Sequence, residues 1–216
     1  LSETETSNLA ANSLTAVMGA DGINLADWFS GGIDELGLWS KALSTTEISD
    51  LYNGGAGNPL NAVYGPGTII VNGKYSKGRQ FNGNGDYLNV PNNSSLNPAS
   101  AMSVTTWIKT TDTGVSKQIL GKTTGCASSG YLLWLNREGI GGAGKPSFWG
   151  GNGPWLDSGV AINDGLWHQV TGTFDGTTSR IYVDGVEKNS GALTGTLSST
   201  TALQIGGAAT GGGCNF

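Results

Sequence analysis

Residues 164–187 read DGLWHQVTGTFDGTTSRIYVDGVE, and this stretch gives the strongest indication of the fold. Apolar and polar side chains alternate in the runs WHQVTGTF and SRIYV, which is the period of a β-strand with one face in a core. Asp175-Gly176 and Asp184-Gly185 follow these two runs, and Asp-Gly pairs supply the positive-φ residues that tight hairpins need. The pattern therefore predicts an antiparallel meander over residues 167–188.

The same alternation recurs in short runs on both sides of the meander. These runs are RQFNG (79–83), DYLNV (86–90), MSVTTWIKT (102–110), KQILGK (117–122), YLLWLN (131–136) and ALQIGG (202–207). The chain of 216 residues has 37 glycines and only 12% charged residues, a balance typical of many short strands joined by tight turns. We expect an all-β protein that is long enough for one large sandwich.

One segment, ALSTTEISDLYNGG (42–55), predicts a helix. Ser44 is placed to cap its N-terminus, and Glu47, three residues later, completes a capping box. Glycines end the segment. An apolar stripe along one side indicates that the helix packs on a surface, and its members are Leu43, Ile48, Leu51 and Tyr52.

Charge and hydropathy exclude two kinds of partner. The formal net charge is -5 and the sequence contains no cluster of Lys or Arg, so we expect no nucleic-acid partner. No apolar run approaches the roughly 18 residues that span a bilayer, so we expect no membrane insertion. No basic segment followed by an apolar stretch opens the sequence, and any signal peptide is expected outside it.

Cys126 and Cys214 both lie in glycine-rich loops, with no neighbouring His or Cys for a metal site or a redox pair. We expect a disulfide between them, which would tie two loops together and indicate an oxidising compartment. Two unrelated thiols are the alternative.

Two stretches of the chain are similar to each other. Without a gap, MGADGINLADWF (18–29) aligns with IGGAATGGGCNF (205–216), and both end on phenylalanine. After Phe29 the chain continues with SGGIDELGLWSKALSTTEISDLYNGG, whereas Phe216 is the last residue. The second copy therefore lacks the ending that the first copy has.

Read in the order 60–216 followed by 30–55, the sequence resembles the laminin-G-like, concanavalin A-like jelly rolls of the bacterial LamG type. The match is carried by GRQFNGNGDYLNVPNNSSLN, MSVTTWIKT, KQILGK, the meander, ALQIGG and FSGGIDELGLWSKALSTTEISDLY. The resemblance implies a two-sheet antiparallel jelly-roll sandwich with one short helix. In that family the closing strand pairs in the same sheets as the opening strand, but here the closing segment comes first.

Three arrangements could produce this order: a window of a tandem array, a circular permutation, or strands donated between subunits. The offset of 187 residues between Phe29 and Phe216 favours an array, because a permutant needs only one copy. We expect residues 1–59 to complete a neighbouring copy by strand addition, and residues 60–216 to form a sandwich that lacks its last strand. The residues expected to make this contact are Phe29, Ile33, Leu36, Leu38 and Trp39. Pairing of residues 30–55 with residues 79–90 of the same chain would instead indicate a permutation.

The resemblance also implies a calcium ion as the one candidate cofactor. Related sandwiches often hold a structural calcium near the closing strand, which points to Asp34, with Asp86 of NGNGDYLNV as its partner. The alternative for Asp34 is a turn or strand-end hydrogen bond, and for Asp86 an Asx turn.

The segment PSFWGGNGPWLDSG (146–159) is the candidate ligand surface. Trp149 and Trp155 could stack on sugar rings, and Asn152 or Asp157 could bond to hydroxyls. Alternation places Phe148 in the core instead. The tryptophans within strand patterns are also expected to be buried, and they are Trp107, Trp134 and Trp167.

Catalysis is not expected. Catalytic relatives carry Glu and Asp at alternating positions of one strand, and Glu35 beside Asp34 points to the opposite face. His168, the only histidine, is expected to be a structural hydrogen-bonding residue.

Two functions follow for a secreted or cell-surface protein. The first is structural: copies complete one another head to tail into a repeat array or filament. The second is a carbohydrate-binding or adhesion module for an extracellular glycan. The split ending favours the first, which is the function we expect, and the family resemblance favours the second, which is the alternative.

Overall fold

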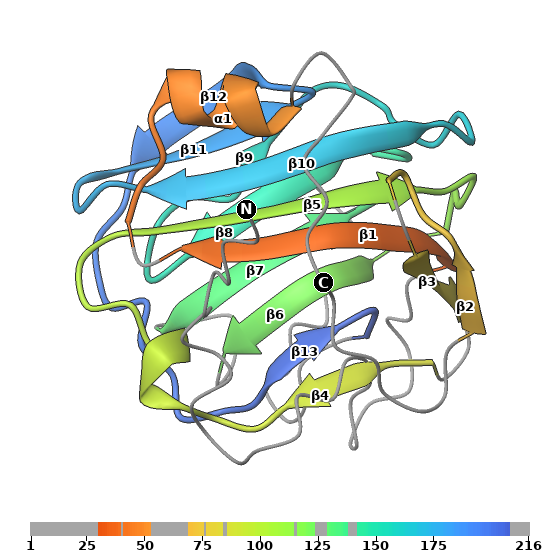
Figure 1. Cartoon of the computed structure of the whole chain (residues 1–216). Coiled ribbons are helices and arrows are strands. Elements are labelled where there is room, and N and C mark those ends of the chain that lie inside the picture. The colour runs from red at the N-terminus through yellow and green to blue at the C-terminus, as the bar shows by residue number, and fades with distance from the viewer. Residues whose placement is uncertain are drawn as a thin grey trace, which may run out of the picture.

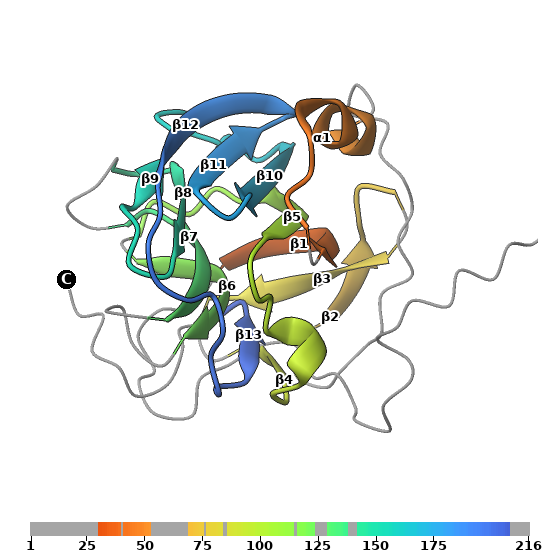
Figure 2. The same cartoon turned by 90° about the vertical axis from the view of Figure 1, so that its left-hand side faces the viewer.

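The computed structural model describes residues 30–39, 41–52, 69–75, 77–83, 86–114, 116–123, 129–137 and 142–207. In this part of the chain two antiparallel sheets lie face to face, and one helix lies outside them (Figures 1 and 2). The predicted fold class, an all-β two-sheet sandwich with one short helix, is confirmed.

One sheet has seven strands. They are β1 (Ser30–Trp39), β2 (Ile69–Asn72), β3 (Lys77–Asn82), β5 (Met102–Lys109), β10 (Trp167–Phe174), β11 (Thr178–Val183) and β12 (Val186–Ala192). Their order across the sheet is β12, β11, β10, β5, β1, β3, β2. The strands β10, β11 and β12 form the predicted meander.

The turns of the meander have the expected chemistry. Asp184 (φ 52°) and Gly185 (φ 76°) form the two-residue loop between β11 and β12, and two positive φ angles are typical of a type I′ turn. Between β10 and β11, the Asp175 carboxylate accepts hydrogen bonds from the backbone N–H groups of Thr177 and Thr178, at 3.0 and 2.8 Å. Both Asp-Gly pairs therefore fix a hairpin.

The other sheet has six strands. They are β4 (Leu88–Val90), β6 (Lys117–Thr123), β7 (Gly130–Leu135), β8 (Pro146–Gly150), β9 (Leu156–Asp157) and β13 (Leu203–Ile205). Their order is β4, β13, β6, β7, β8, β9. β8 lies in the segment that the sequence predicts as a ligand surface. Its adjacent aromatic residues Phe148 and Trp149 face opposite sides of the sheet, so only Trp149 lies on the outer face.

β1 lies inside the seven-stranded sheet, between β3 and β5 of the same chain (Figure 1). Ile33 is opposite Arg79 on β3 and opposite Ile108 on β5. A register shift interrupts the β5 ladder between Asp34 and Gly37. The closing strand β1 thus pairs through backbone hydrogen bonds with β3 on one side and β5 on the other, and both belong to its own chain.

This pairing differs from the expected completion of a neighbouring copy. The sandwich formed within residues 60–216 receives its closing strand from Ser30–Trp39 of the same chain, which is the permuted order. The residues expected to contact a neighbour pack accordingly: Ile33 is in the main core, Leu36 and Leu38 pack against that core, and Trp39 packs beside the helix. Phe29 lies outside the described residues.

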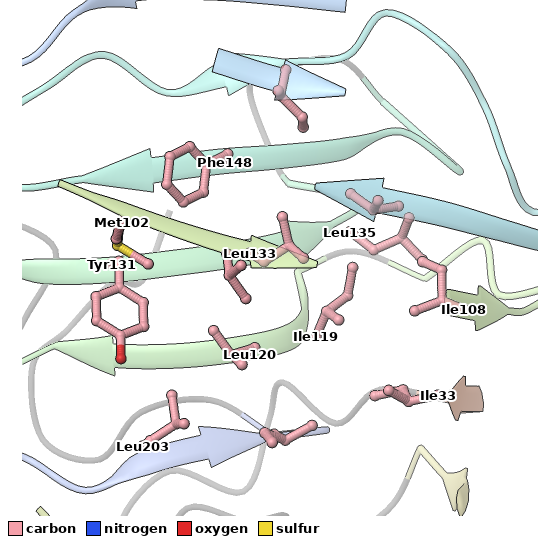
Figure 3. Close-up of a cluster of buried hydrophobic side chains, with 14 of the residues drawn as sticks. Ile33, Met102, Ile108, Ile119, Leu120, Tyr131, Leu133, Leu135, Phe148 and Leu203 are labelled. Atoms are coloured by element: carbon pink, nitrogen blue, oxygen red, sulfur yellow. The ribbon is translucent and has the colours of Figure 1, made fainter. Parts of the chain in front are cut away.

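The main core fills the space between the sheets. Figure 3 shows Ile33, Met102, Leu120, Tyr131 and Phe148 converging in it, and all five are at most 5% exposed. Phe148 is in the core, as alternation predicts. The Tyr131 hydroxyl, the one polar tip in this view, donates to the carbonyl of Leu96 at 3.1 Å.

The helix α1 (Thr45–Tyr52) begins as predicted. The Glu47 carboxylate accepts a hydrogen bond from the Ser44 backbone N–H at 2.9 Å, and the Ser44 hydroxyl accepts one from the Glu47 N–H at 3.2 Å, so the capping box is confirmed. Ile48 and Leu43 form a small cluster with Tyr182 of β11, and Trp39 packs against it. The helix therefore covers part of the outer face of the seven-stranded sheet (Figure 2).

Candidate functional site

Alternation on β7 divides its side chains between the two faces of the six-stranded sheet. Tyr131, Leu133 and Leu135 belong to the core between the sheets. Leu132 and Trp134 belong to a separate cluster with Trp149 of β8, and Trp155 packs against this cluster. We call the three indoles Trp134, Trp149 and Trp155 the tryptophan patch. It lies on the outer face of the sheet.

Trp134 lies in a row of residues that crosses the sheet and is otherwise polar. The register pairs one residue from each of four adjacent strands, and we call these four residues the polar row: Gln118, Trp134, Ser147 and Asp157. Asp157 is half-buried at the edge strand β9, and its carboxylate accepts a hydrogen bond from the Gly159 N–H at 2.7 Å. The Ser147 hydroxyl lies 3.4 Å from the other Asp157 oxygen. The patch therefore has hydrogen-bonding groups next to its aromatic rings.

Trp155, from the loop between β8 and β9, is the most accessible indole of the patch. It is half-buried, whereas Trp134 and Trp149 are 4% and 3% exposed. Its ring stacks on Trp149 (centroids 6.0 Å apart, planes at 26°) and meets Trp134 edge-on at 5.9 Å. The Arg137 guanidinium carbon lies 4.2 Å from the Trp155 ring centroid, a cation–π distance.

The indole Nε1–H group of Trp134 is buried. It makes no hydrogen bond in the described part of the chain. A buried donor without a partner is unfavourable by about 1–3 kcal/mol. An oxygen from outside the chain would reach this buried atom only after a covering side chain, such as Trp155, moves aside. The outer face of this sheet therefore combines aromatic surface with a donor that lacks a partner.

The structure brings together three of the four predicted ligand residues. Trp149, Trp155 and Asp157 lie on the same sheet face, although Trp149 is buried. Asn152 lies in the exposed turn after β8, where its backbone N–H donates to the Thr194 carbonyl at 2.6 Å.

Trp134 and Arg137 were missed as site residues. Trp134 is buried, as predicted, but it belongs to the patch instead of the main core. The pattern Tyr-Leu-Leu-Trp-Leu already contained a signal, because Trp134 alternates with core residues and so must face outward. Arg137 follows β7 and had no local signal.

The other predicted tryptophans lie on the seven-stranded sheet. Trp107 is 2% exposed, as expected, and the ring of Tyr52 from α1 stacks on it at 5.9 Å. Trp167 is half-buried at the start of β10, so its prediction is only partly met.

The two predicted calcium ligands are not adjacent. The Asp86 carboxylate accepts a hydrogen bond from the Asn82 N–H at 3.0 Å, and Asn82 is opposite Ser30 of β1. Asp34 lies four residues further along β1, a distance of about 13 Å at the usual rise of a strand. The calcium site at these two residues stays a prediction. Among the described residues there is no group of three or more His, Cys, Asp or Glu that could hold a metal.

His168 makes structural hydrogen bonds, as predicted. Its Nδ1 lies 2.7 Å from an Asp184 oxygen, and its Nε2 lies 3.2 Å from an Asp164 oxygen. The hydrogen bond with Asp184 raises the pKa of His168, and the bond with Asp164 adds to that shift. Asp184 also accepts the Gln169 N–H at 2.9 Å, so the histidine is held against the β11–β12 turn.

The predicted disulfide concerns residues outside the described part of the chain. Cys126 and Cys214 both fall there, so their disulfide stays a prediction. Within the described part, no helix is long and apolar enough to cross a membrane.

Comparisons with known proteins agree with this geometry. A family model described as the concanavalin A-like lectin/glucanases superfamily matches residues 82–216. Among solved structures, domain 4 of AbnA, an extracellular arabinanase from Geobacillus stearothermophilus in complex with arabinotriose, is 19% identical with a TM-score of 0.53. That match covers 92% of this chain and 85% of the other. At this identity, the likeness shows the fold alone.

A second match is to domains LG4-5 of the mouse laminin alpha1 chain. It is 18% identical with a TM-score of 0.43, and it covers 59% of this chain and 32% of the laminin fragment. The chain thus spans about a third of that structure. No curated protein sequence matches the chain.

Proposed function

This chain belongs to the concanavalin A-like lectin/glucanases superfamily, and on that premise we propose that it is a non-catalytic carbohydrate-binding module of an extracellular protein. The tryptophan patch is the proposed sugar site. The observation that carries the proposal is the buried Trp134 Nε1 donor, which has no acceptor in the described chain and lies beside two further indoles.

Sugars are recognised by the two kinds of group that the patch offers. Their C–H surfaces pack on aromatic rings, and their hydroxyls exchange hydrogen bonds with side chains. Trp155 supplies the accessible ring, Trp134 a donor, and Asp157 an acceptor at the edge of the sheet. Asn152, exposed in the turn between β8 and Trp155, is a further candidate contact.

The comparison with a solved structure supports an extracellular glycan as the ligand. The AbnA domain is bound to arabinotriose and is part of an extracellular arabinanase, which supports an extracellular glycan as the partner of this chain. We propose no catalytic role for the patch, because its polar row contains one carboxylate, Asp157, where glycosidases use a pair.

Head-to-tail assembly, the other expected function, has less support. The pairing of β1 with β3 and β5 completes the sandwich within one chain, so a neighbouring copy is not needed to order the closing strand.

Affinity electrophoresis through gels with soluble arabinan, xylan or β-glucan tests the proposal. The wild-type chain is expected to be retarded by at least one polysaccharide and to release no reducing sugar from it. Trp155→Ala is expected to weaken binding about tenfold, which corresponds to one lost aromatic contact.

Trp39→Ala is the matched control, since Trp39 is also a half-buried tryptophan but packs beside α1 on the other sheet. It is expected to bind like the wild type. Equal loss in both folded variants, or no retardation of the wild type by any of these polysaccharides, would contradict the proposal.

A further inference from the structure

Lys122 of β6 is a completely buried lysine. Its side chain is 0% exposed, and its Nζ lies within 2.7 Å of three oxygens. These oxygens are the side-chain oxygen of Asn92 at 2.7 Å, the carbonyl of Ser199 at 2.7 Å and the carbonyl of Thr201 at 2.6 Å. All three N–H bonds of the ammonium group therefore have an acceptor.

None of these acceptors is charged. A buried charge is normally paired with an opposite charge or held by several polar groups, because burial alone strongly disfavours it. Burial lowers the pKa of Lys122 to about 8. No ion pair joins Lys122 to a carboxylate in the described chain, so three neutral oxygens solvate the cation.

A second set of hydrogen bonds holds the three oxygens in position. Asn97 donates to the Asn92 side-chain oxygen at 3.0 Å, and its own oxygen accepts the Ser199 N–H at 3.1 Å. The hydroxyls of Ser199 and Thr201 are 2.8 Å apart. The oxygens are thus oriented by groups other than the lysine.

This cluster lies where short ladders join β4 and β13 to the six-stranded sheet. The edge strand β4 and its neighbour β13 are three residues each, and two residue pairs join β13 to β6. Asn92 follows β4, Ser199 and Thr201 precede β13, and Lys122 comes from β6. One ammonium group therefore ties both edge segments to the adjacent strand.

We propose that the oxygens of Asn92, Ser199 and Thr201 form a cation site that the chain fills with its own Lys122 ammonium group, and that takes a free primary alkylammonium ion when the lysine side chain is removed. The site selects a monovalent ammonium because three neutral acceptors match its three N–H bonds. Calcium needs six to eight oxygens, several of them carboxylates.

Thermal melts of Lys122→Ala with and without n-propylammonium, which replaces the deleted atoms, test this inference. The substitution is expected to lower the Tm by about 5 °C or more, since it removes three charge-assisted hydrogen bonds. Propylammonium is expected to restore a few degrees, whereas propan-1-ol or sodium chloride at the same concentration restores none.

Two variants make the controls. Lys122→Met fills the space without a charge and is expected to stay destabilised in propylammonium. Lys117→Ala, at the start of the same strand, removes a lysine that lies 3.9 Å from an Asp112 oxygen, and it is expected to melt close to the wild type. Equal effects of propylammonium and sodium chloride on Lys122→Ala, or wild-type stability of Lys122→Met, would overturn the inference.

If Lys122→Ala does not fold, the wild-type protein still provides a test. Ammonium protons that are buried and fully bonded exchange slowly with water, so a lysine ¹H–¹⁵N ammonium signal that Lys122→Met lacks is expected at pH 6. A Lys122 amine that is neutral at that pH, or an ammonium that exchanges as fast as those of surface lysines, would overturn the assignment.

Discussion

Both sheets of this sandwich carry tryptophans on their outer faces, but the two faces are covered in different ways. On the seven-stranded sheet, Trp107 lies under Tyr52 of α1, and Ile48 of the same helix is fully buried. On the six-stranded sheet, Trp134 and Trp149 lie under Trp155, which comes from a loop and is itself half-buried. An aromatic outer face is therefore not in itself a ligand site; the element that covers it makes the difference.

The polar groups of the two faces do not by themselves distinguish them. Near α1, the Ser103 hydroxyl of β5 accepts a hydrogen bond from the Leu43 N–H at 2.7 Å and donates one to the Lys41 carbonyl at 2.8 Å. The segment between β1 and α1 is therefore hydrogen-bonded to β5. In the tryptophan patch, Trp134 Nε1 has no acceptor among the described residues. Buried polar atoms without a partner occur on both sheets in the described chain, since Gln169 Oε1 and Thr173 Oγ1 of β10 also have none. The difference between the two faces is therefore the helix that covers one of them.

The largest expected effect is on the helix-covered face. Ile48→Ala is expected to lower the free energy of unfolding by about 2–4 kcal/mol, because the side chain is 0% exposed and its removal leaves a cavity between α1 and β11. Urea denaturation measures this change. Carbohydrate binding by the folded variant should be unchanged, and a loss of binding would show that the two faces are not independent.

Most of the strands and the start of the helix could be predicted from the sequence. Alternation located the meander, β3 to β7 and β13, and Ser44 with Glu47 located the capping box, because these signals are local. The placement of β1 could not be obtained in this way. Its alternation fits the sheet of any copy of the fold, so the repeat pattern before Phe29 and Phe216 pointed to a neighbour although the pairing with Ile108 is within the chain.

The candidate site was predicted in part for a similar reason. Trp149, Trp155 and Asp157 are close in sequence, so one aromatic-rich segment indicated all three. Trp134 joins them only through the pairing of β7 with β8. The calcium prediction carried two residues over from a family pattern, and the structure places Asp34 opposite Trp107 and Asp86 beside Asn82, at separate positions along the sheet.

A smaller effect is expected from the pH dependence that His168 adds to the stability of the seven-stranded sheet. His168 is the only histidine, and its pKa is raised in the folded chain by Asp184 and then Asp164. Its stabilising contribution is therefore complete below the unfolded pKa of about 6.5 and is lost as the pH rises through the higher folded pKa.

Urea melts between pH 5.5 and pH 8.5 measure this contribution. The wild type should lose stability over that range relative to His168→Gln, in which the slope is expected to be flatter. Parallel slopes would contradict the assigned hydrogen bonds, and a pH-dependent change in sugar binding would show that the meander contributes to the patch.

The indole N–H signals of ¹⁵N-labelled protein, assigned by single Trp→Phe substitutions, test whether sugar binds at the tryptophan patch. Titration with the oligosaccharide of whichever polysaccharide retards the chain should shift the signals of Trp134 and Trp155, with the Trp134 proton moving downfield as it gains an acceptor. The Trp39 and Trp107 signals should stay fixed. Shifts confined to Trp39 and Trp107, or no shift at any tryptophan under saturating sugar, would contradict the assignment of the ligand site to the six-stranded sheet.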